Sequence, residues 1–319
     1  MALLDISDLA VRFRMLRGDV HAVNGVDLTV EAGSTVALVG ESGSGKSVTA
    51  LAVLGLLSPA ATVTRGRIDF DGRPLLGLSE RQLRTVRGAE LAMIFQDPMT
   101  GLNPVLSVGA QVREVVEAHT DMSRATATKR AVELLDEVGI PDPTRRAEQF
   151  PHQFSGGMRQ RAMIAIAIAC NPRMLIADEP TTALDVTVQA QILDLLRRLI
   201  RDHGMALLLI THDLGVVADM CELTNVMYGG RVVESASTRE LFRAPSHPYT
   251  RALLQSIPTL QAGRKTRLAT IEGQPPVLRS APVGCTFARR FPRMLERCRT
   301  DTPPLDPVAR DHVCACWNP

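Results

Sequence analysis

The chain has 319 residues, with 45% hydrophobic residues, 22% charged residues and a formal net charge of +2. This balance is typical of a globular protein with a sizeable core, and it excludes a disordered tail or a mini-protein. Because aromatic residues make up only 3% of the chain, we expect the core to be aliphatic. No block of like charge forms a basic arm or stripe, so the composition gives no support to nucleic acid binding.

The sequence contains no segment typical of a membrane span or a secretion signal. Its longest apolar run, residues 162–170, is about half of the 18 residues that a spanning helix needs. Residues 1–10 include two aspartates and no apolar segment of the signal-peptide type. We therefore expect a cytosolic protein. Its six cysteines are too few for a disulfide scaffold, although four of them follow position 284.

The first part of the chain predicts an antiparallel sheet, and the middle predicts a parallel one. Residues 3–30 have the pattern of short alternating strands joined by a turn at 17–19, and residues 68–72 of a further strand and turn. Four later runs are almost continuously apolar, as expected for strands buried on both faces of a parallel sheet. These runs are residues 35–39, 91–95, 174–177 and 206–210. The predicted fold class is α/β.

Helical patterns separate these strands, and a change in composition marks the end of the region with regular periodicity. The predicted helices are residues 47–57, 112–118, 125–138, 158–169 and 186–201. Residues 228–233 carry a Gly-Gly pair between apolar residues and predict a tight hairpin. From residue 257 onward, prolines interrupt every periodic pattern, which predicts a domain boundary there.

A glycine-rich loop follows the first apolar run. Residues 40–47 read Gly-Glu-Ser-Gly-Ser-Gly-Lys-Ser, which matches the Gly-x-x-x-x-Gly-Lys-Ser motif in its strand–loop–helix context. The glycines let backbone N–H groups turn toward phosphates, Lys46 neutralises their charge, and the Ser47 hydroxyl can ligate Mg²⁺. The alternatives are a simple Gly/Ser turn and a dinucleotide fingerprint. Val48 argues against the fingerprint because it stands where a third Gly or Ala belongs.

Polar residues also follow the other three runs of the predicted parallel sheet. Asp178 and Glu179 end one of them; the aspartate suits a magnesium shell and the glutamate suits a general base. Taken alone, this pair is equally compatible with an acidic helix cap before Pro180. The glycine-rich loop is what favours the interpretation as a nucleotide site. Gln96 and His212 end the other two runs, where they can orient water or donate a hydrogen bond to a terminal phosphate.

With the segment Ser155-Gly156-Gly157 and residues 183–185, these motifs make residues 1–255 resemble the nucleotide-binding subunits of ABC transporters. The Ser-Gly-Gly segment is the decisive feature, because P-loop kinases and GTPases lack it. Read by itself, Ser155 can cap a helix whose dipole and two bare glycines attract an anion. The segment departs from the usual family pattern in having Phe154 in place of leucine.

The resemblance implies an ATPase that uses ATP and Mg²⁺ and closes head to tail with a second ATP-binding subunit around two ATP molecules. In that arrangement the Ser-Gly-Gly segment meets the γ-phosphate held by the other subunit, and Asp185 lies along the seam. The residues implied to bind nucleotide are Phe13 (stacked on adenine), Gly40, Ser42, Gly43, Gly45, Lys46, Ser47, Val48, Ser155, Gly156, Gly157 and Asp185. The implied catalytic residues are Glu179, His212 and Gln96, and the implied magnesium ligands are Ser47, Gln96 and Asp178.

Residues 95–104, 150–153 and 247–250 resemble more narrowly the ATPases of dipeptide, oligopeptide and nickel importers. That branch also carries a C-terminal extension, here residues 256–319, and a helical subdomain at about residues 97–160 that receives a membrane subunit. The resemblance implies a peripheral position on the cytoplasmic face of the membrane. Its partners there are a sister ATP-binding subunit or a second copy, two permease subunits and, through them, an extracytoplasmic solute-binding protein. Peptide uptake is expected, with nickel or another small solute as the alternative.

The same branch often has four C-terminal cysteines that ligate an iron–sulfur cluster. Cys285, Cys298 and Cys316 match three of those positions, Phe291 stands at the remaining one, and Cys314 is the candidate for the fourth ligand. Thiolate sets of this kind suit a [4Fe-4S] cluster or zinc. The alternative is a set of free thiols in a proline-rich docking segment.

Two other functions are compatible with parts of the sequence. A soluble ABC-type ATPase of DNA repair needs long heptad coils or zinc modules between the two nucleotide motifs, and only about a hundred residues intervene here. A small-molecule P-loop kinase is disfavoured by the Ser-Gly-Gly segment and by His212.

Overall fold

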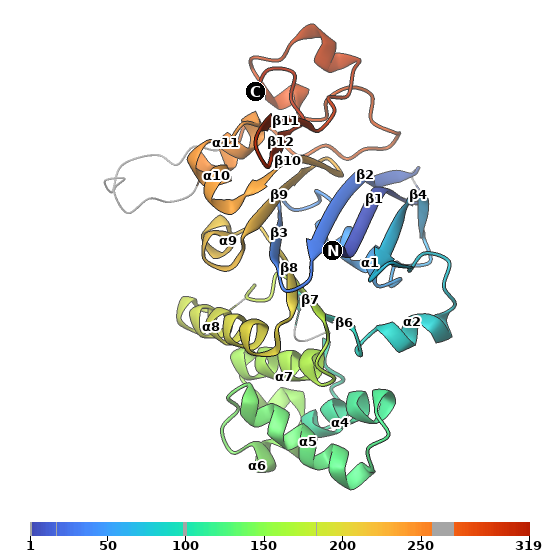
Figure 1. Cartoon of the computed structure of the whole chain (residues 1–319), viewed down its shortest axis with the longest axis vertical. Helices are drawn as coiled ribbons and strands as arrows, with labels where there is room; N and C mark the ends of the chain where they lie inside the picture. The colour runs from blue at the N-terminus through green and yellow to red at the C-terminus, as the bar shows by residue number, and fades with distance from the viewer. Residues whose placement is uncertain (1, 17, 98–100, 183, 257–270) are drawn as a thin grey trace. The chain divides into compact units, whose positions relative to one another are not determined.

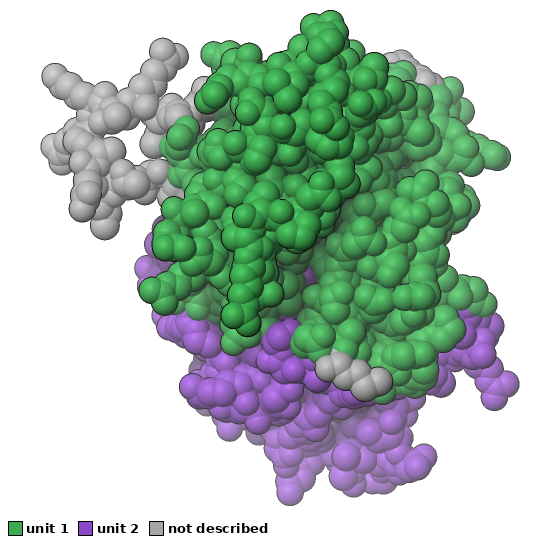
Figure 2. Space-filling view, turned by 45° about the horizontal axis from the view of Figure 1, so that its top comes forward, with its two compact units in different colours: residues 1–31, 35–77, 209–319 green, residues 32–34, 78–208 purple. Residues whose placement is uncertain are grey.

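The computed structural model describes residues 2–16, 18–97, 101–182, 184–256 and 271–319 (Figure 1). The chain divides into two compact units, which Figure 2 distinguishes by colour. Unit 1 consists of Met1–Glu31, Thr35–Gly77 and Leu209–Pro319, and unit 2 of Ala32–Ser34 and Leu78–Leu208. Residue 17 of the predicted turn, residues 98–100 of the importer-like segment and residue 183 of the ABC-type motif lie outside the described residues.

Unit 1 begins with the predicted antiparallel sheet. Its strand order is β2-β1-β4-β5, formed by β1 (Ala2–Phe13), β2 (Val20–Glu31), β4 (Ala61–Phe70) and β5 (Arg73–Pro74). Buried aliphatic side chains such as Leu4, Ile6, Val26 and Ile68 fill its inner face. The antiparallel arrangement is confirmed, although β1 and β2 are each twelve residues long and therefore longer than the short strands predicted.

A second sheet of unit 1 combines a predicted parallel strand with a hairpin. Its order is β11-β12-β10-β9-β3, with β3 (Thr35–Val39), β9 (Leu223–Tyr228), β10 (Arg231–Ser237), β11 (Asp306–Ala309) and β12 (His312–Cys314). Strands β3 and β9 are parallel, and the predicted Gly-Gly turn joins β9 to β10. The sequence pattern did not predict β11 and β12. Pro307 is tolerated in β11 because, among the described strands, this one lies at the end of the order next to β12.

Unit 1 also contains several helices and an aromatic cluster. The helices are α1 (Lys46–Val53), α9 (Leu214–Met220), α10 (Thr238–Arg243), α11 (Pro248–Gln255) and the 3-10 helices η2 (Ala288–Arg290) and η3 (Glu296–Arg299). Both tyrosines of the chain, Tyr228 and Tyr249, pack against Phe287, with ring centroids 5.1 and 5.5 Å from that of the phenylalanine. The expected aliphatic core is therefore interrupted where the C-terminal extension packs on the hairpin and on α11.

Unit 2 contains further predicted parallel strands and most of the predicted helices. Strands β6 (Leu91–Ile94) and β7 (Met174–Asp178) pair in parallel, and β8 (Ala206–Thr211), in which the chain returns to unit 1, follows in the order β8-β7-β6. Its helices are α2 (Glu80–Val86), α4 (Val108–His119), α5 (Arg124–Glu137), α6 (Pro143–Ala147), α7 (Gly156–Ile168) and α8 (Val186–His203), with the 3-10 turn η1 (Pro151–Gln153).

Within unit 2, helices α4, α5 and α6 pack together, and α4 and α5 also pack against α7 (Figure 1). Apolar side chains from successive turns meet in this group, including Val112 of α4, Leu134 of α5 and Ile164 of α7, all of which are buried. The α/β class predicted from the sequence is confirmed by these sheets and helices. Across the described segments, no helix has both the length and the apolar character needed to cross a bilayer.

Candidate functional site

The glycine-rich loop of unit 1 runs from the end of β3 to the start of α1 along a path that only glycine permits at two positions. A Cβ atom on Gly40 would lie 2.2 Å from the carbonyl oxygen of Met227, and one on Gly45 would lie 2.5 Å from that of Ala22. Gly45 also has φ +108° at the N-cap of α1. The loop backbone therefore lies directly against β2 and β9, and its shape is set before any ligand binds.

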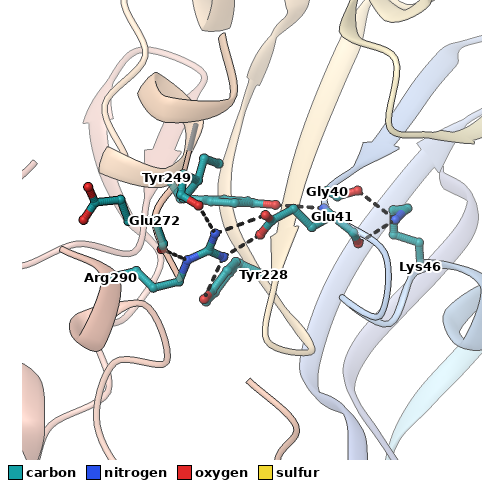
Figure 3. A network of polar contacts seen from close by, with 8 residues as sticks. Gly40, Glu41, Lys46, Tyr228, Tyr249, Glu272 and Arg290 are labelled. Carbon is teal, nitrogen blue, oxygen red and sulfur yellow. Dashed lines mark hydrogen bonds and ion pairs between the residues drawn. The ribbon is translucent and has the colours of Figure 1, made fainter. Parts of the chain in front are cut away.

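Lys46 is held inside this loop. Its side chain is only 5% exposed, and its Nζ donates to the carbonyl oxygens of Gly40 at 2.8 Å and Glu41 at 3.0 Å (Figure 3). The Ser44 hydroxyl is also buried and has no hydrogen-bond partner among the described residues. A cradle that gathers an ammonium, a buried hydroxyl and the N-terminal amides of a helix fits a phosphate group.

The remaining loop residues predicted to bind nucleotide are accessible. Ser42 and Gly43 are exposed, while Ser47 and Val48, in the first turn of α1, are half-buried. The hydroxyl of Ser47 and the carboxylate of Asp178 are the oxygen ligands that Mg²⁺ prefers. Ser47 belongs to unit 1. Asp178 ends β7 in unit 2 and is 4% exposed.

Unit 2 brings two of the predicted catalytic residues together. The Glu179 carboxylate accepts a hydrogen bond from the Gln96 amide at 3.0 Å and another from the Thr182 hydroxyl at 2.9 Å. Glu179 has φ +46°, a left-handed conformation that is unfavourable for a residue with a side chain. Such strain is common at functional sites, where it fixes the direction of a reacting group. The carboxylate is thus aimed and held beside an amide, an arrangement suited to orienting a water molecule.

The Ser-Gly-Gly segment forms the start of α7, two residues before the predicted helix. Ser155 is the N-cap of α7, and its hydroxyl accepts a hydrogen bond from the Met158 N–H at 3.3 Å, so the predicted capping role is confirmed. Ser155 and Gly156 are both exposed. The N-terminus of α7 is therefore accessible, and the amides of its first turn point toward that exposed end.

The second glycine of this segment is required by packing. A Cβ atom on Gly157 would lie 2.7 Å from Cγ1 of Val188, because α7 and α8 approach closely there. Asp185, at the N-terminus of α8, is exposed and accepts a hydrogen bond from the Val188 N–H at 3.0 Å. Capping thus accounts structurally for Asp185, and its place at a dimer seam stays a prediction.

His212 and Phe13 lie in unit 1. His212 is exposed and follows β8, immediately before the N-cap of α9. Phe13 is half-buried at the end of β1, where it pairs with Val20 of β2. Val20 contributes to an apolar cavity of about 510 Å³ that is also lined by Met15, Leu16 and Val277. Stacking of Phe13 on adenine stays a prediction, and an apolar cavity next to it is compatible with that role.

The predicted iron–sulfur site is not supported by the structure. Within the described residues, which include all four C-terminal cysteines, no group of three or more His, Cys, Asp or Glu side chains gathers closely enough to hold a metal ion. Burial instead raises the pKa of the thiols of Cys285, Cys314 and Cys316, which favours the protonated form. Cys285 and Cys298 are neighbours, since the Cys285 N–H donates to the Cys298 carbonyl oxygen at 2.8 Å, but the match in spacing did not predict a group of three ligands.

Sequence reasoning missed the residues that surround the glycine-rich loop on its other side. Glu41 belongs to the loop, and its carboxylate forms an ion pair with Arg290, whose NH1 lies 2.6 Å from it. The two residues are 249 positions apart, and no local pattern marks Arg290. The only available signal was the acidic residue itself, which is unexpected in a loop suited to binding anions.

Comparisons with known proteins agree with this geometry. The ABC transporter family model matches residues 23–182, and the model of the oligopeptide/dipeptide transporter C-terminal region matches residues 233–298. The probable peptide ABC transporter ATP-binding protein y4tR of Sinorhizobium fredii is 53% identical over 99% of this chain and 95% of its own length. The oligopeptide transport ATP-binding protein OppD of Bacillus subtilis is 49% identical over 99% of this chain and 88% of its own.

Solved structures give the same result for the fold. The dimeric ATP-binding cassette MJ0796 bound to ADP and Pi matches with a TM-score of 0.67 and 28% identity, covering 74% of this chain and 99% of that one. The chain therefore belongs to the ATP-binding proteins of ABC transporters, and it is an ATPase of that type. Within the family, it carries the C-terminal region typical of oligopeptide and dipeptide transporters.

Proposed function

We propose that this chain hydrolyses ATP to power the uptake of di- or oligopeptides through partner membrane subunits. The observation that carries the proposal is the glycine-rich loop, which holds Lys46 in a buried phosphate cradle at the end of β3. The C-terminal match at residues 233–298 and the names of the relatives support peptides as the substrate class. We assign residues 1–255 to the nucleotide-binding domain and 256–319 to its extension.

Unit 1 binds the triphosphate in this proposal. The amides of Gly43 and Gly45 and the ammonium of Lys46 contact the phosphates, and Phe13 stacks on adenine. Ser47, Asp178 and Gln96 would hold Mg²⁺, which when bound neutralises developing charge on the phosphates. Because Lys46 is already held in the loop, little side-chain entropy remains to be lost when the nucleotide arrives.

Unit 2 supplies the general base, and His212 of unit 1 assists it. Glu179 accepts a proton from the water that attacks the γ-phosphate, and its hydrogen bonds to Gln96 and Thr182 hold the carboxylate in place for that transfer. His212, at the end of β8, donates a hydrogen bond to the terminal phosphate. Gln96 also begins the stretch that leads to the helical subdomain, so a movement there would reach the Glu179 carboxylate directly.

A second ATP-binding subunit completes the site. The exposed N-terminus of α7, with Ser155, Gly156 and Gly157, binds the γ-phosphate held by the sister subunit, and Asp185 lies along the seam. A sister protein or a second copy fills this role, and two permease subunits contact the helical subdomain at about residues 97–160. The chain is thereby attached to the cytoplasmic face of the membrane through its partners, and an extracytoplasmic binding protein delivers the solute.

Nucleotide binding to the full-length chain tests the proposal. We expect Lys46→Ala to weaken MgATP binding at least tenfold, while Lys129→Ala, an exposed lysine on α5, leaves binding unchanged. Identical affinities in both variants would contradict the phosphate role of the loop. In a reconstituted transporter, ATP-dependent uptake of a defined di- or oligopeptide, with nickel uptake measured in parallel, tests the substrate class. Nickel uptake without peptide uptake would overturn the peptide assignment.

A further inference from the structure

Glu41, the second residue of the glycine-rich loop, is held at three separate points. Its N–H donates to the Tyr249 hydroxyl at 2.8 Å, and its carbonyl oxygen accepts from Lys46 Nζ at 3.0 Å. Its carboxylate accepts two hydrogen bonds from the guanidinium of Arg290, at 2.6 and 3.2 Å. Figure 3 shows the carboxylate directed toward Arg290 and Lys46 on the other side of the loop backbone. Main chain and side chain of one residue therefore join the loop to α11 and to the C-terminal extension.

The Arg290 side chain is buried and makes several polar contacts. Its side chain is 5% exposed, and besides Glu41 it donates to the Tyr228 hydroxyl at 3.3 Å and to the carbonyl oxygens of Glu272 at 2.8 Å and Ile271 at 3.1 Å. The hydrogen bonds to Glu41 raise the pKa of Arg290, so the guanidinium stays charged at every relevant pH. A bidentate pair of this kind is geometrically specific, in contrast to an exposed ion pair whose side chains move freely.

Aromatic side chains pack around this ion pair. The Arg290 guanidinium lies 5.7 Å from the ring centroid of Tyr228, and Tyr228 packs on Tyr249 with ring centroids 4.6 Å apart. Phe287, at the start of η2, contacts both tyrosines. The scarce aromatic residues of the chain are thus concentrated where Arg290 meets the loop, and they fix the position from which it acts.

A carboxylate within a loop that binds a triphosphate has an electrostatic cost, because like charges repel. Pairing with Arg290 cancels that charge and draws the side chain away from Lys46. We propose that Arg290 is a positioning residue, through which the C-terminal extension sets the glycine-rich loop and Lys46 for ATP by way of Glu41. This inference rests on the proposed function, since it presumes that Lys46 binds the phosphates.

MgATP affinity of the full-length chain tests the inference. We expect Arg290→Ala to weaken binding about tenfold, because the loop loses its anchor and an unpaired carboxylate faces the nucleotide. Arg289→Ala is the matched control, since Arg289 is an exposed neighbour in the same 3-10 helix. Equal affinities in the two variants would overturn the inference. If Lys46→Ala also binds like wild type, the proposed function itself has failed, which keeps the two failures distinct.

Arg290 also donates to the carbonyl oxygens of residues 271 and 272, so Arg290→Ala could weaken ATP binding by disturbing the fold of the extension rather than by breaking the contact with the loop. Glu41→Gln distinguishes these two causes without touching the extension. A positioning role predicts several-fold weaker ATP binding, whereas mere removal of a repelling charge predicts tighter binding, and tighter or unchanged binding would overturn the inference. Tyr249→Phe removes the other tether of Glu41 and should weaken binding in the same direction.

A double-mutant comparison completes the test. If Arg290 acts through Glu41, adding Arg290→Ala to Glu41→Gln changes the affinity less than about twofold, because the interaction is already lost. If the two losses multiply instead, Arg290 acts by another route and the inference is wrong. Thermal unfolding of each variant, measured without nucleotide, shows that affinities are compared between folded proteins.

Discussion

The two units present their functional residues in opposite ways. In unit 1 the phosphate loop is a buried backbone cradle, fitted against β2 and β9 and joined through Glu41 to residues more than 200 positions away. In unit 2 Gln96, Ser155 and Asp185 are exposed, and two of them cap helices. The phosphate loop of unit 1 is thus held by contacts within one chain, whereas these residues of unit 2 are exposed and available to a second subunit. This difference is what the proposed head-to-tail assembly requires.

The largest effect is expected at Glu179. If unit 1 grips the nucleotide and unit 2 supplies the base, Glu179→Gln should lower ATP turnover at least 100-fold, as removal of a general base commonly does, while MgATP binding is retained. Steady-state phosphate release and equilibrium binding measure the two quantities. Glu133→Gln, a partly exposed position on α5, is the control. Unchanged turnover in the Glu179 variant would refute the assigned base.

Two Glu–His contacts, one in each unit, allow the stability contributions of a buried and a partly exposed pair to be compared. In unit 1, Glu234 is fully buried and accepts hydrogen bonds from the Ser246 and His247 N–H groups at 2.6 and 3.0 Å and contacts His312 at 2.7 Å. We expect Glu234→Ala to lower the free energy of unfolding by about 3 to 5 kcal/mol, because the Ser246 and His247 N–H groups and the His312 imidazole lose their shared acceptor at once.

In unit 2, the equivalent contact joins Glu137 and His203, also at 2.7 Å, but both side chains are partly exposed. We expect Glu137→Ala to cost only about 1 kcal/mol, since water solvates the remaining imidazole. Denaturant unfolding of both variants measures the difference. Similar losses would show that burial does not separate the two contacts.

The pH dependence of the free energy of unfolding gives a further test, which concerns unit 1. Burial, with a contribution from the positive charge of Arg251, lowers the pKa of His247 to about 3. Below about pH 6.5 His247 therefore binds a proton in the unfolded chain but not in the folded chain. The free energy of unfolding falls as the pH decreases from about 6.5 toward 3. The slope is about 1.4 kcal/mol per pH unit, or about 2 kcal/mol at pH 5.

His247→Asn is the variant for this test. The His247 Nδ1 accepts the Tyr249 N–H at 3.1 Å as the N-cap of α11, and asparagine can keep that cap without titrating. The variant should lose less stability than wild type between pH 7 and pH 5. An unchanged pH profile by denaturant unfolding would contradict a neutral buried imidazole.

The smallest effect separates capping from phosphate binding in unit 2. Ser155 and Ser123 cap α7 and α5 with the same hydrogen-bond length of 3.3 Å. Each Ser→Ala change should lower the free energy of unfolding by about 1 kcal/mol. Only Ser155→Ala should also lower ATP turnover of the assembled transporter, by about tenfold. Equal turnover in both variants would assign Ser155 to capping alone.

Local patterns predicted much of the fold and the loop. The apolar run 35–39 coincides with β3, the Gly-Gly pair forms the predicted hairpin, and Ser155 caps the predicted helix. Each of these features depends on neighbours in sequence. Strands β11 and β12 were missed because both are short, β11 contains Pro307, and they form by pairing with each other and, for β12, with β10.

Contacts between distant residues were beyond the sequence pattern. Nothing local to Arg290 indicates a partner 249 positions away, and nothing local to Gln96 indicates its contact with Glu179. The C-terminal cysteines show the opposite error. Their spacing matched a ligand set, whereas within the described residues no three of these side chains form a group that could hold a metal ion. Spacing along a chain predicts a metal site only when the fold also brings the ligand atoms themselves together.

The central claim is that Lys46 of one subunit and the α7 N-terminus of another enclose the same triphosphate. A structure of the assembled transporter carrying Glu179→Gln and loaded with MgATP measures this directly. We expect the Ser155 hydroxyl to lie within hydrogen-bond distance of a γ-phosphate that contacts Lys46 of the opposite subunit. Ser155 facing solvent, with the nucleotide covered by some other surface, would contradict it.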